Sequence, residues 1–171
     1  MIIERVWAMP NKHTFLIKPI KELVDGLVGD GKAWIDPFAG KYSVAEYAND
    51  LNPEYSRPFC VDANSLPDML PENMRYAGVL FDPPYSLTQV ARSYKNFGVT
   101  GWNKKDPTGG FCSLKTRLAH LLPVGAKAVC CGWNTVGFGK TRGFSLDRVL
   151  VVCHGGNRND TLVTVETKAT E

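Results

Sequence analysis

A short apolar run that ends on an aspartate occurs four times in the first half of this 171-residue chain, and it constrains the fold more than any other feature. The runs close at Asp36, Asp50, Asp62 and Asp82. Apolar runs of this length, bounded by turn residues, are typical of buried strands. In open α/β sheets, ligands bind beyond the carboxyl ends of the strands. The pattern therefore predicts a single α/β domain with a mostly parallel sheet and a ligand site at the strand ends.

The fourth run leads into Asp82-Pro83-Pro84-Tyr85. Each proline fixes its own φ and disfavours the helical conformation of the residue before it, so the chain leaves the strand as a rigid, extended loop. The Asp82 carboxylate and the proline carbonyls are hydrogen-bond acceptors, and Tyr85 offers a flat aromatic face. Such a loop suits a planar amine. A proline-rich turn with a solvated aspartate is the alternative interpretation.

The exocyclic amine of a nucleobase is a poor nucleophile until acceptors take hydrogen bonds from both of its hydrogens. Asp82 and a proline carbonyl would do this while the base stacks on Tyr85. Catalysis would then be mostly positioning of the amine against an electrophilic methyl group. A base in a duplex must first be flipped out, which costs roughly a few kcal/mol.

Composition indicates an ordinary globular protein, because 44% of the residues are hydrophobic, 22% are charged and the net charge is only +3. The five cysteines form no C-x-x-C pair and lie mainly in apolar runs, so we expect reduced core residues and no metal site. No basic segment precedes a long apolar run, and no apolar stretch is long enough to span a bilayer. We therefore expect a cytoplasmic protein without a membrane partner.

A cofactor loop is predicted after the first run. Apolar residues at helical spacing predict a helix over residues 17–28, and a buried strand follows at 32–36. The strand ends in Pro37-Phe38-Ala39-Gly40, where a glycine lets a ligand approach the backbone. Asp50 lies one β unit later, where a carboxylate usually holds ribose hydroxyls. A linking turn and a solvated Asp50 are the corresponding alternatives.

The remaining segments predict nucleic-acid contacts and the second half of the sheet. Residues 86–110 mix basic and aromatic side chains, which suits either a flexible nucleic-acid contact or a solvated loop over aromatic anchors. A helix over 112–122, a strand over 126–132 and a glycine-rich basic loop over 134–143 follow. Residues 146–152 and 161–165 predict an antiparallel strand pair. Residues 1–13 read as an irregular leader in which Trp7 packs, and we expect His154 to be structural rather than catalytic.

Five motifs carry a resemblance to a known family. They are Ile17-Lys18-Pro19-Ile20, Ile35-Asp36-Pro37-Phe38-Ala39-Gly40, Asn49-Asp50-Leu51-Asn52-Pro53-Glu54, Asp62-Ala63 and Asp82-Pro83-Pro84-Tyr85. With them the chain resembles the amino-methyltransferases that modify DNA using S-adenosylmethionine. Among these it is most similar to small phage-encoded adenine-N6 enzymes, in which an acid heads the catalytic loop. Gly132-Trp133-Asn134-Thr135 and His154-Gly155-Gly156 strengthen this likeness.

The resemblance implies a Rossmann-like methyltransferase fold with a mostly parallel twisted sheet, a C-terminal antiparallel strand pair and helices on both faces. It implies one catalytic domain over residues 1–171 without a separate target-recognition domain. The implied cofactor is S-adenosyl-L-methionine and the partner is DNA. A homodimer would be one source of sequence specificity. The implied location is the host-cell cytoplasm.

Residue by residue, the resemblance implies that Asp82, Pro83, Pro84 and Tyr85 are catalytic. The implied cofactor site comprises Phe15, Lys18, Pro19, Asp36, Pro37, Phe38, Ala39, Gly40, Asp50, Leu51, Asp62, Ala63 and Asp82. We expect nucleic acid to contact Arg92, Lys95, Lys104, Lys105, Trp133, Asn134, Lys140, Arg142 and Arg158. One departure is that Lys41-Tyr42-Ser43 replaces the family's second glycine and small hydroxyl residues. The same chemistry on RNA and a non-catalytic nucleic-acid-binding protein are the alternative functions.

Overall fold

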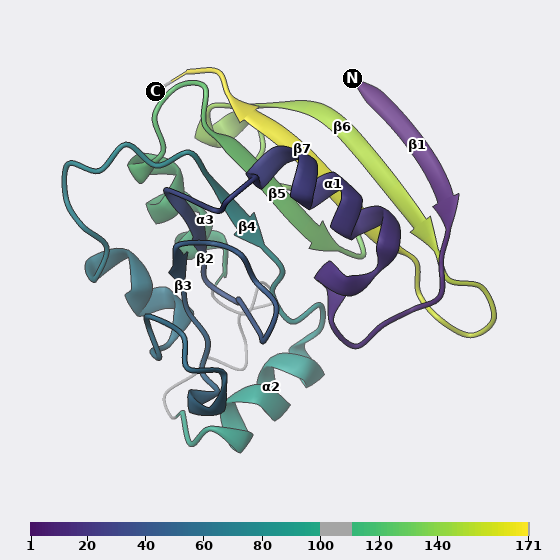
Figure 1. Cartoon of the computed structure of the whole chain (residues 1–171), viewed down its shortest axis with the longest axis horizontal. Helices are drawn as coiled ribbons and strands as arrows, with labels where there is room; N and C mark the ends of the chain where they lie inside the picture. The colour runs from purple at the N-terminus through teal and green to yellow at the C-terminus, as the bar shows by residue number, and fades with distance from the viewer. Residues whose placement is uncertain (100–110, 171) are drawn as a thin grey trace.

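A seven-stranded sheet forms the centre of the protein in a computed structural model that describes residues 1–99 and 111–170 (Figure 1). The strand order is β1-β6-β7-β5-β4-β2-β3. The strands are β1 (Ile2–Trp7), β2 (Trp34–Asp36), β3 (Tyr47–Ala48), β4 (Gly78–Phe81), β5 (Lys127–Gly132), β6 (Phe144–Cys153) and β7 (Thr161–Lys168). Only β7 pairs antiparallel, with β5 and β6. The predicted mostly parallel sheet with a C-terminal antiparallel pair is confirmed.

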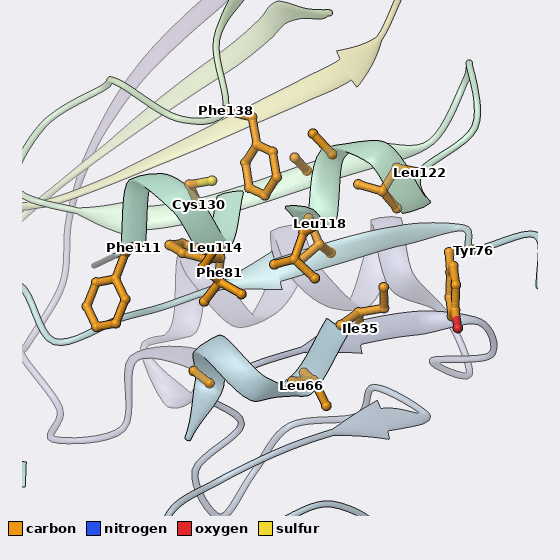
Figure 2. Close-up of a cluster of buried hydrophobic side chains, with 14 of the residues drawn as sticks. Ile35, Leu66, Tyr76, Phe81, Phe111, Leu114, Leu118, Leu122, Cys130 and Phe138 are labelled. Atoms are coloured by element: carbon orange, nitrogen blue, oxygen red, sulfur yellow. The ribbon is translucent and has the colours of Figure 1, made fainter. Parts of the chain in front are cut away.

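Helices cover both faces of the sheet, as predicted. The helices are α1 (Lys18–Val28), α2 (Leu87–Asn96) and α3 (Phe111–Leu121). In β4, Leu80 packs with α1 on one face, whereas Val79 and Phe81 pack with α3 on the other. Figure 2 shows the second cluster, in which Phe81 lies beneath the leucines of α3. None of the helices in the described part of the chain is long and apolar enough to cross a membrane.

The helix predicted over residues 17–28 is confirmed as α1. Pro19 lies in its first turn, where its missing N–H group has no intrahelical partner to lose. Gly29 ends the helix with a φ of 61°, a conformation that costs glycine little because it has no Cβ. The buried face of α1 comprises Ile20, Leu23, Val24 and Val28.

Two elements were missed. The segment predicted as an irregular leader contains β1, which lies at the edge of the sheet and pairs with β6. Trp7 is 66% exposed on this strand rather than packed. Residues 87–96, predicted to lie in a flexible segment, form α2. Ser86 caps this helix by accepting a hydrogen bond from the Gln89 N–H, and Val90 and Tyr94 form its buried face.

Two smaller expectations also change. The run ending at Asp62 makes a single bridge, between Asn49 and Phe59, rather than a strand, and a short 3-10 helix, Ala63–Asp68, follows it. All five cysteines are free, but Cys60 and Cys112 are exposed instead of lying in the core.

Candidate active site

The carboxyl ends of the parallel strands open into a cavity of about 630 Å³. This volume lies within the range of small-molecule and cofactor sites, roughly 300–1,000 Å³. The expected site residues that line it are Pro37, Phe38, Asp50, Leu51, Ala63, Asp82, Pro83, Pro84, Tyr85, Trp133 and Arg158. The four strand-end runs thus meet at one site, as the sequence pattern predicts.

A second cavity of about 380 Å³ adjoins the first, and both are lined by Phe38, Asp50 and Asp82. Its other walls include Phe15 and the Ala39-Gly40 turn. The two cavities together therefore form an elongated site with Asp82, the first residue of the Asp82-Pro83-Pro84-Tyr85 loop, at their junction.

Asp36 lies behind the wall of this site. Its side chain is fully buried and lines neither cavity. The carboxylate accepts hydrogen bonds from the Phe38 N–H (3.0 Å) and the Ser43 hydroxyl (2.6 Å), so it holds the cofactor loop in shape. Burial raises the pKa of Asp36 to about 7, with a smaller contribution from the nearby Asp82 carboxylate, although the two hydrogen bonds oppose the rise.

The raised pKa makes stability depend on pH. The folded protein binds the Asp36 proton more tightly than the unfolded chain does, so the stabilisation is complete below about pH 4 and is lost as the pH rises towards about 7. We expect Asp36→Asn to reduce this loss by up to about 4 kcal/mol. Urea unfolding of both proteins at several pH values measures the effect. Identical pH slopes would contradict the assignment.

Asp50 links the cofactor loop to the segment after β3. It accepts hydrogen bonds from the Gly40 N–H and the Asn52 N–H, both at 2.8 Å. The neighbouring Asn49 is buried, and its amide donates to the carbonyls of Pro37 and Val61 at 3.0 Å. Sequence reasoning gave this asparagine no role in the site, although it directly precedes Asp50 at the end of an apolar run. Its network fixes the three strand-end loops relative to one another.

Asp62 does not line the first cavity, although the adjacent Ala63 does. The Asp62 carboxylate caps the 3-10 helix by accepting a hydrogen bond from the Asn64 N–H (2.8 Å). It also interacts with the Tyr94 hydroxyl, and burial together with this carboxylate raises the pKa of Tyr94. Tyr94 lines the cavity, so Asp62 positions part of its wall.

The Asp82-Pro83-Pro84-Tyr85 loop is closed on itself. The Tyr85 hydroxyl donates a hydrogen bond to the Asp82 carboxylate, and the Thr14 hydroxyl lies 3.5 Å from the Tyr85 oxygen. Burial raises the pKa of Asp82, whereas hydrogen bonds from Tyr85 and Thr14 lower it. The Tyr85 ring also meets Trp133 edge to face, with a centroid separation of 5.7 Å. A carboxylate acceptor and two aromatic rings therefore lie together at the end of β4.

Two solved structures share much of this arrangement of strands and helices. TrmN from Thermus thermophilus matches 92% of this chain with a TM-score of 0.57 and 19% identity. A second match is the 1,6-didemethyltoxoflavin-N1-methyltransferase of Burkholderia thailandensis, solved with 1,6-didemethyltoxoflavin and S-adenosylhomocysteine. It covers 90% of this chain and 78% of its own, with a TM-score of 0.57 and 11% identity. This chain has a methyltransferase fold. It spans half the length of TrmN, and no protein-family model or curated protein matches the sequence.

Within this methyltransferase fold, part of the expected cofactor site lies elsewhere. Lys18 and Pro19 line neither of the two cavities. Lys18 is exposed on α1, with its ammonium 3.9 Å from the Glu22 carboxylate. The residues just before the helix, Thr14 and Ile17, line the first cavity instead.

The residues expected to contact nucleic acid are spread over several elements. Trp133 and Asn134 are exposed after β5 and line a third cavity, of about 370 Å³, together with Pro83, Pro84 and Tyr85. Arg92, Lys95 and Lys140 are exposed and line none of the three cavities. Lys104 and Lys105 lie outside the described residues.

Arg142 is engaged with the protein rather than directed to solvent. Its guanidinium donates to the Thr116 hydroxyl (3.0 Å) and to the Phe138 carbonyl (2.8 Å). These bonds fasten the loop after β5 to α3. Glu166 holds the same loop from the sheet by accepting hydrogen bonds from the N–H groups of Phe138 and Gly139. The loop that carries Trp133 is thus fixed from two sides.

His154 has the structural position expected for it. One ring nitrogen lies 2.9 Å from the Ala8 carbonyl oxygen, and the other lies 2.9 Å from the Thr161 hydroxyl. The buried ring therefore ties the N-terminal segment to the end of the sheet, where that segment forms one wall of the first cavity.

Proposed function

We propose that this chain transfers the methyl group of S-adenosylmethionine to the exocyclic N6 amine of adenine in DNA. The observation that carries the proposal is the Asp82-Pro83-Pro84-Tyr85 loop, which leaves β4 at the junction of two cofactor-sized cavities. The S-adenosylhomocysteine bound by the Burkholderia methyltransferase supports the choice of cofactor.

The cofactor would lie along the elongated site. Asp50 would accept hydrogen bonds from the ribose hydroxyls, because a carboxylate oxygen that already accepts one backbone N–H retains a further lone pair. Leu51 and Ala63 would flank the adenine ring, and Phe38 would lie beside the sulfonium. When bound, S-adenosylmethionine supplies an electrophilic methyl group.

Asp82 would activate the target amine. Its carboxylate would accept a hydrogen bond from one amine N–H and a proline carbonyl of the loop would accept one from the other, which directs the nitrogen lone pair at the methyl carbon. As the N–C bond forms, the S–C bond of the cofactor would break to leave S-adenosylhomocysteine, and the excess amine proton would pass to the Asp82 carboxylate. Tyr85 can keep its hydroxyl bond to one oxygen of this carboxylate while the other oxygen accepts the hydrogen bond from the amine. Its ring would then stack on the base that has left the duplex.

The proposed substrate is tested by methyl transfer from labelled S-adenosylmethionine into unmethylated duplex DNA and into RNA of matched sequence. We expect label in N6-methyladenine of the DNA. Label confined to RNA would show that the substrate of the same reaction is RNA and not DNA. Absence of label from both polymers, with cofactor binding intact by calorimetry, would contradict transfer to nucleic acid.

The ribose assignment gives a separate prediction. We expect Asp50→Ala to weaken the affinity for S-adenosylhomocysteine by about tenfold or more, because a charge-assisted hydrogen bond is lost and the Gly40 N–H loses its acceptor. Isothermal titration calorimetry measures the change. Asp30→Ala, on the turn after α1, is the matched control. Unchanged affinity in Asp50→Ala would remove Asp50 from the cofactor site.

A further inference from the structure

Three basic side chains gather at the outer rim of the second cavity. Lys12 and His13 come from the N-terminal segment, and Lys41 comes from the turn after the cofactor loop. Tyr42 joins the two segments, because its ring meets the His13 ring edge to face at 4.8 Å and lies 5.7 Å from the Lys41 ammonium. The cluster therefore closes over the cavity from two parts of the chain that are far apart in sequence.

The two lysines of this rim form no ion pair with the described residues. Neither Lys12 nor Lys41 has an acidic side chain within ion-pair distance in the described ranges, 1–99 and 111–170. Burial and, after it, the charges of Lys12 and Lys41 lower the pKa of His13. The part of this shift that comes from the two lysine charges is what a site that favours an anion produces.

The carboxylates of the cavity are less exposed than its two lysines. Asp82 accepts a hydrogen bond from the Tyr85 hydroxyl, and Asp50 accepts hydrogen bonds from backbone N–H groups. The site is thus negative where a sulfonium would lie and positive at the rim. This polarity matches a zwitterion whose cationic sulfur points inward and whose carboxylate points outward.

We infer that Lys12 and Lys41 form a subsite for an oxyanion, filled by the α-carboxylate of the methionine half of S-adenosylmethionine. The inference rests on the cofactor of the proposed function. Lys41 directly follows Gly40, whose φ of 53° turns the chain over the cavity, so its ammonium can reach a ligand that passes this turn. Lys41 belongs to the segment in which the sequence departs from the family it resembles. The Lys41 ammonium would therefore supply a full positive charge, which the neutral backbone groups of a small-residue turn cannot supply.

A phosphate of the nucleic acid is a second source of the same chemistry, because Lys12 also lines the first cavity. The two sources of the oxyanion can be told apart because a lysine variant would lose affinity for a different ligand in each case. Removal of a carboxylate contact weakens the cofactor alone. Removal of a phosphate contact weakens nucleic-acid binding for all sequences and lowers its salt dependence by about one counterion per lysine.

The test compares S-adenosylmethionine with decarboxylated S-adenosylmethionine by calorimetry in the full chain, because the two ligands differ only in the carboxylate. We expect Lys41→Met and Lys12→Met each to weaken S-adenosylmethionine binding by about tenfold and to leave the decarboxylated ligand within about twofold. Lys41→Arg should retain most of the affinity because it keeps the charge. Lys32→Met, at the opposite end of β2, is the matched surface control.

A parallel titration of duplex DNA over a series of salt concentrations separates the phosphate source. A lower salt slope in the lysine variants, with cofactor affinity unchanged, would keep the oxyanion subsite and assign it to phosphate. Equal losses for both nucleosides, or no loss for either nucleoside or DNA, would overturn the subsite. If the wild-type chain bound neither nucleoside, the proposed cofactor itself would be wrong. This result differs from the failure of the subsite alone, in which the wild type and the lysine variants would bind S-adenosylmethionine equally well.

Discussion

Replacing Asp82 by asparagine is expected to lower the methyl-transfer rate by about 10³-fold while the affinity for S-adenosylhomocysteine changes by less than about fivefold. Asparagine keeps the shape of the side chain but removes the charge that draws on the amine hydrogen. It also allows the amide NH₂ to face the target amine, and two donors repel one another. Asp82→Asn should therefore lower the rate of methyl transfer and leave the affinity for the cofactor nearly unchanged.

The change in the free energy of unfolding caused by Asp82→Asn serves as the control on folding, and its sign follows from the pKa of Asp82. Burial raises the pKa of Asp82, so its ionised form destabilises the folded protein above the ordinary pKa of an aspartate. Asp82→Asn should consequently leave the free energy of unfolding at pH 8 unchanged or raise it. Urea unfolding and single-turnover transfer assays test the two properties on the same preparation. An active Asp82→Asn protein would contradict the mechanism, and Asp25→Asn on the surface of α1 is the matched control.

The strand-end aspartates were predictable because their positions depend on local pattern and on one rule of sheet geometry. Asp36 ends β2, Asp82 follows β4, and β2 pairs parallel with both β3 and β4. Their carboxyl ends must then lie at one edge of the sheet. Tertiary contacts set the finer roles. The buried position of Asp36 depends on a hydrogen bond from Ser43, in a turn whose course over the loop no sequence period encodes.

Elements stabilised by distant partners were harder to predict. Strand β1 is placed at the edge of the sheet by its pairing with β6, where Glu4 pairs with Arg148, and the local sequence does not encode this partner. Arg142 looks like a phosphate ligand in a glycine-rich loop, yet its partners Thr116 and Cys112 lie on α3. By contrast, the signals for α2 were present in the sequence. The Ser86 cap and the Val90–Tyr94 spacing predict a helix once the basic and aromatic composition is set aside.

Tyr85 supports the second large prediction because its ring and its hydroxyl have separable roles. Tyr85→Ala should lower kcat/KM for nucleic acid by about 10²-fold, since stacking of a base on an aromatic ring contributes roughly 1–3 kcal/mol and the hydrogen bond to Asp82 is also lost. Tyr85→Phe should retain the stacking and most of the rate at high pH. Steady-state kinetics with DNA measures both variants, and full activity of Tyr85→Ala would exclude the stacking role.

The hydroxyl of Tyr85 acts through Asp82, so its removal has a signature in the pH profile. The hydrogen bond from Tyr85 lowers the pKa of Asp82, and its loss in Tyr85→Phe raises that pKa further. Less ionised carboxylate is then present at a given pH, and the acid limb of the rate should move to higher pH. In an Asp82→Asn background the Tyr85→Phe change should shift nothing, because the titrating group is gone. A shift that persisted there would assign the limb to a group other than Asp82.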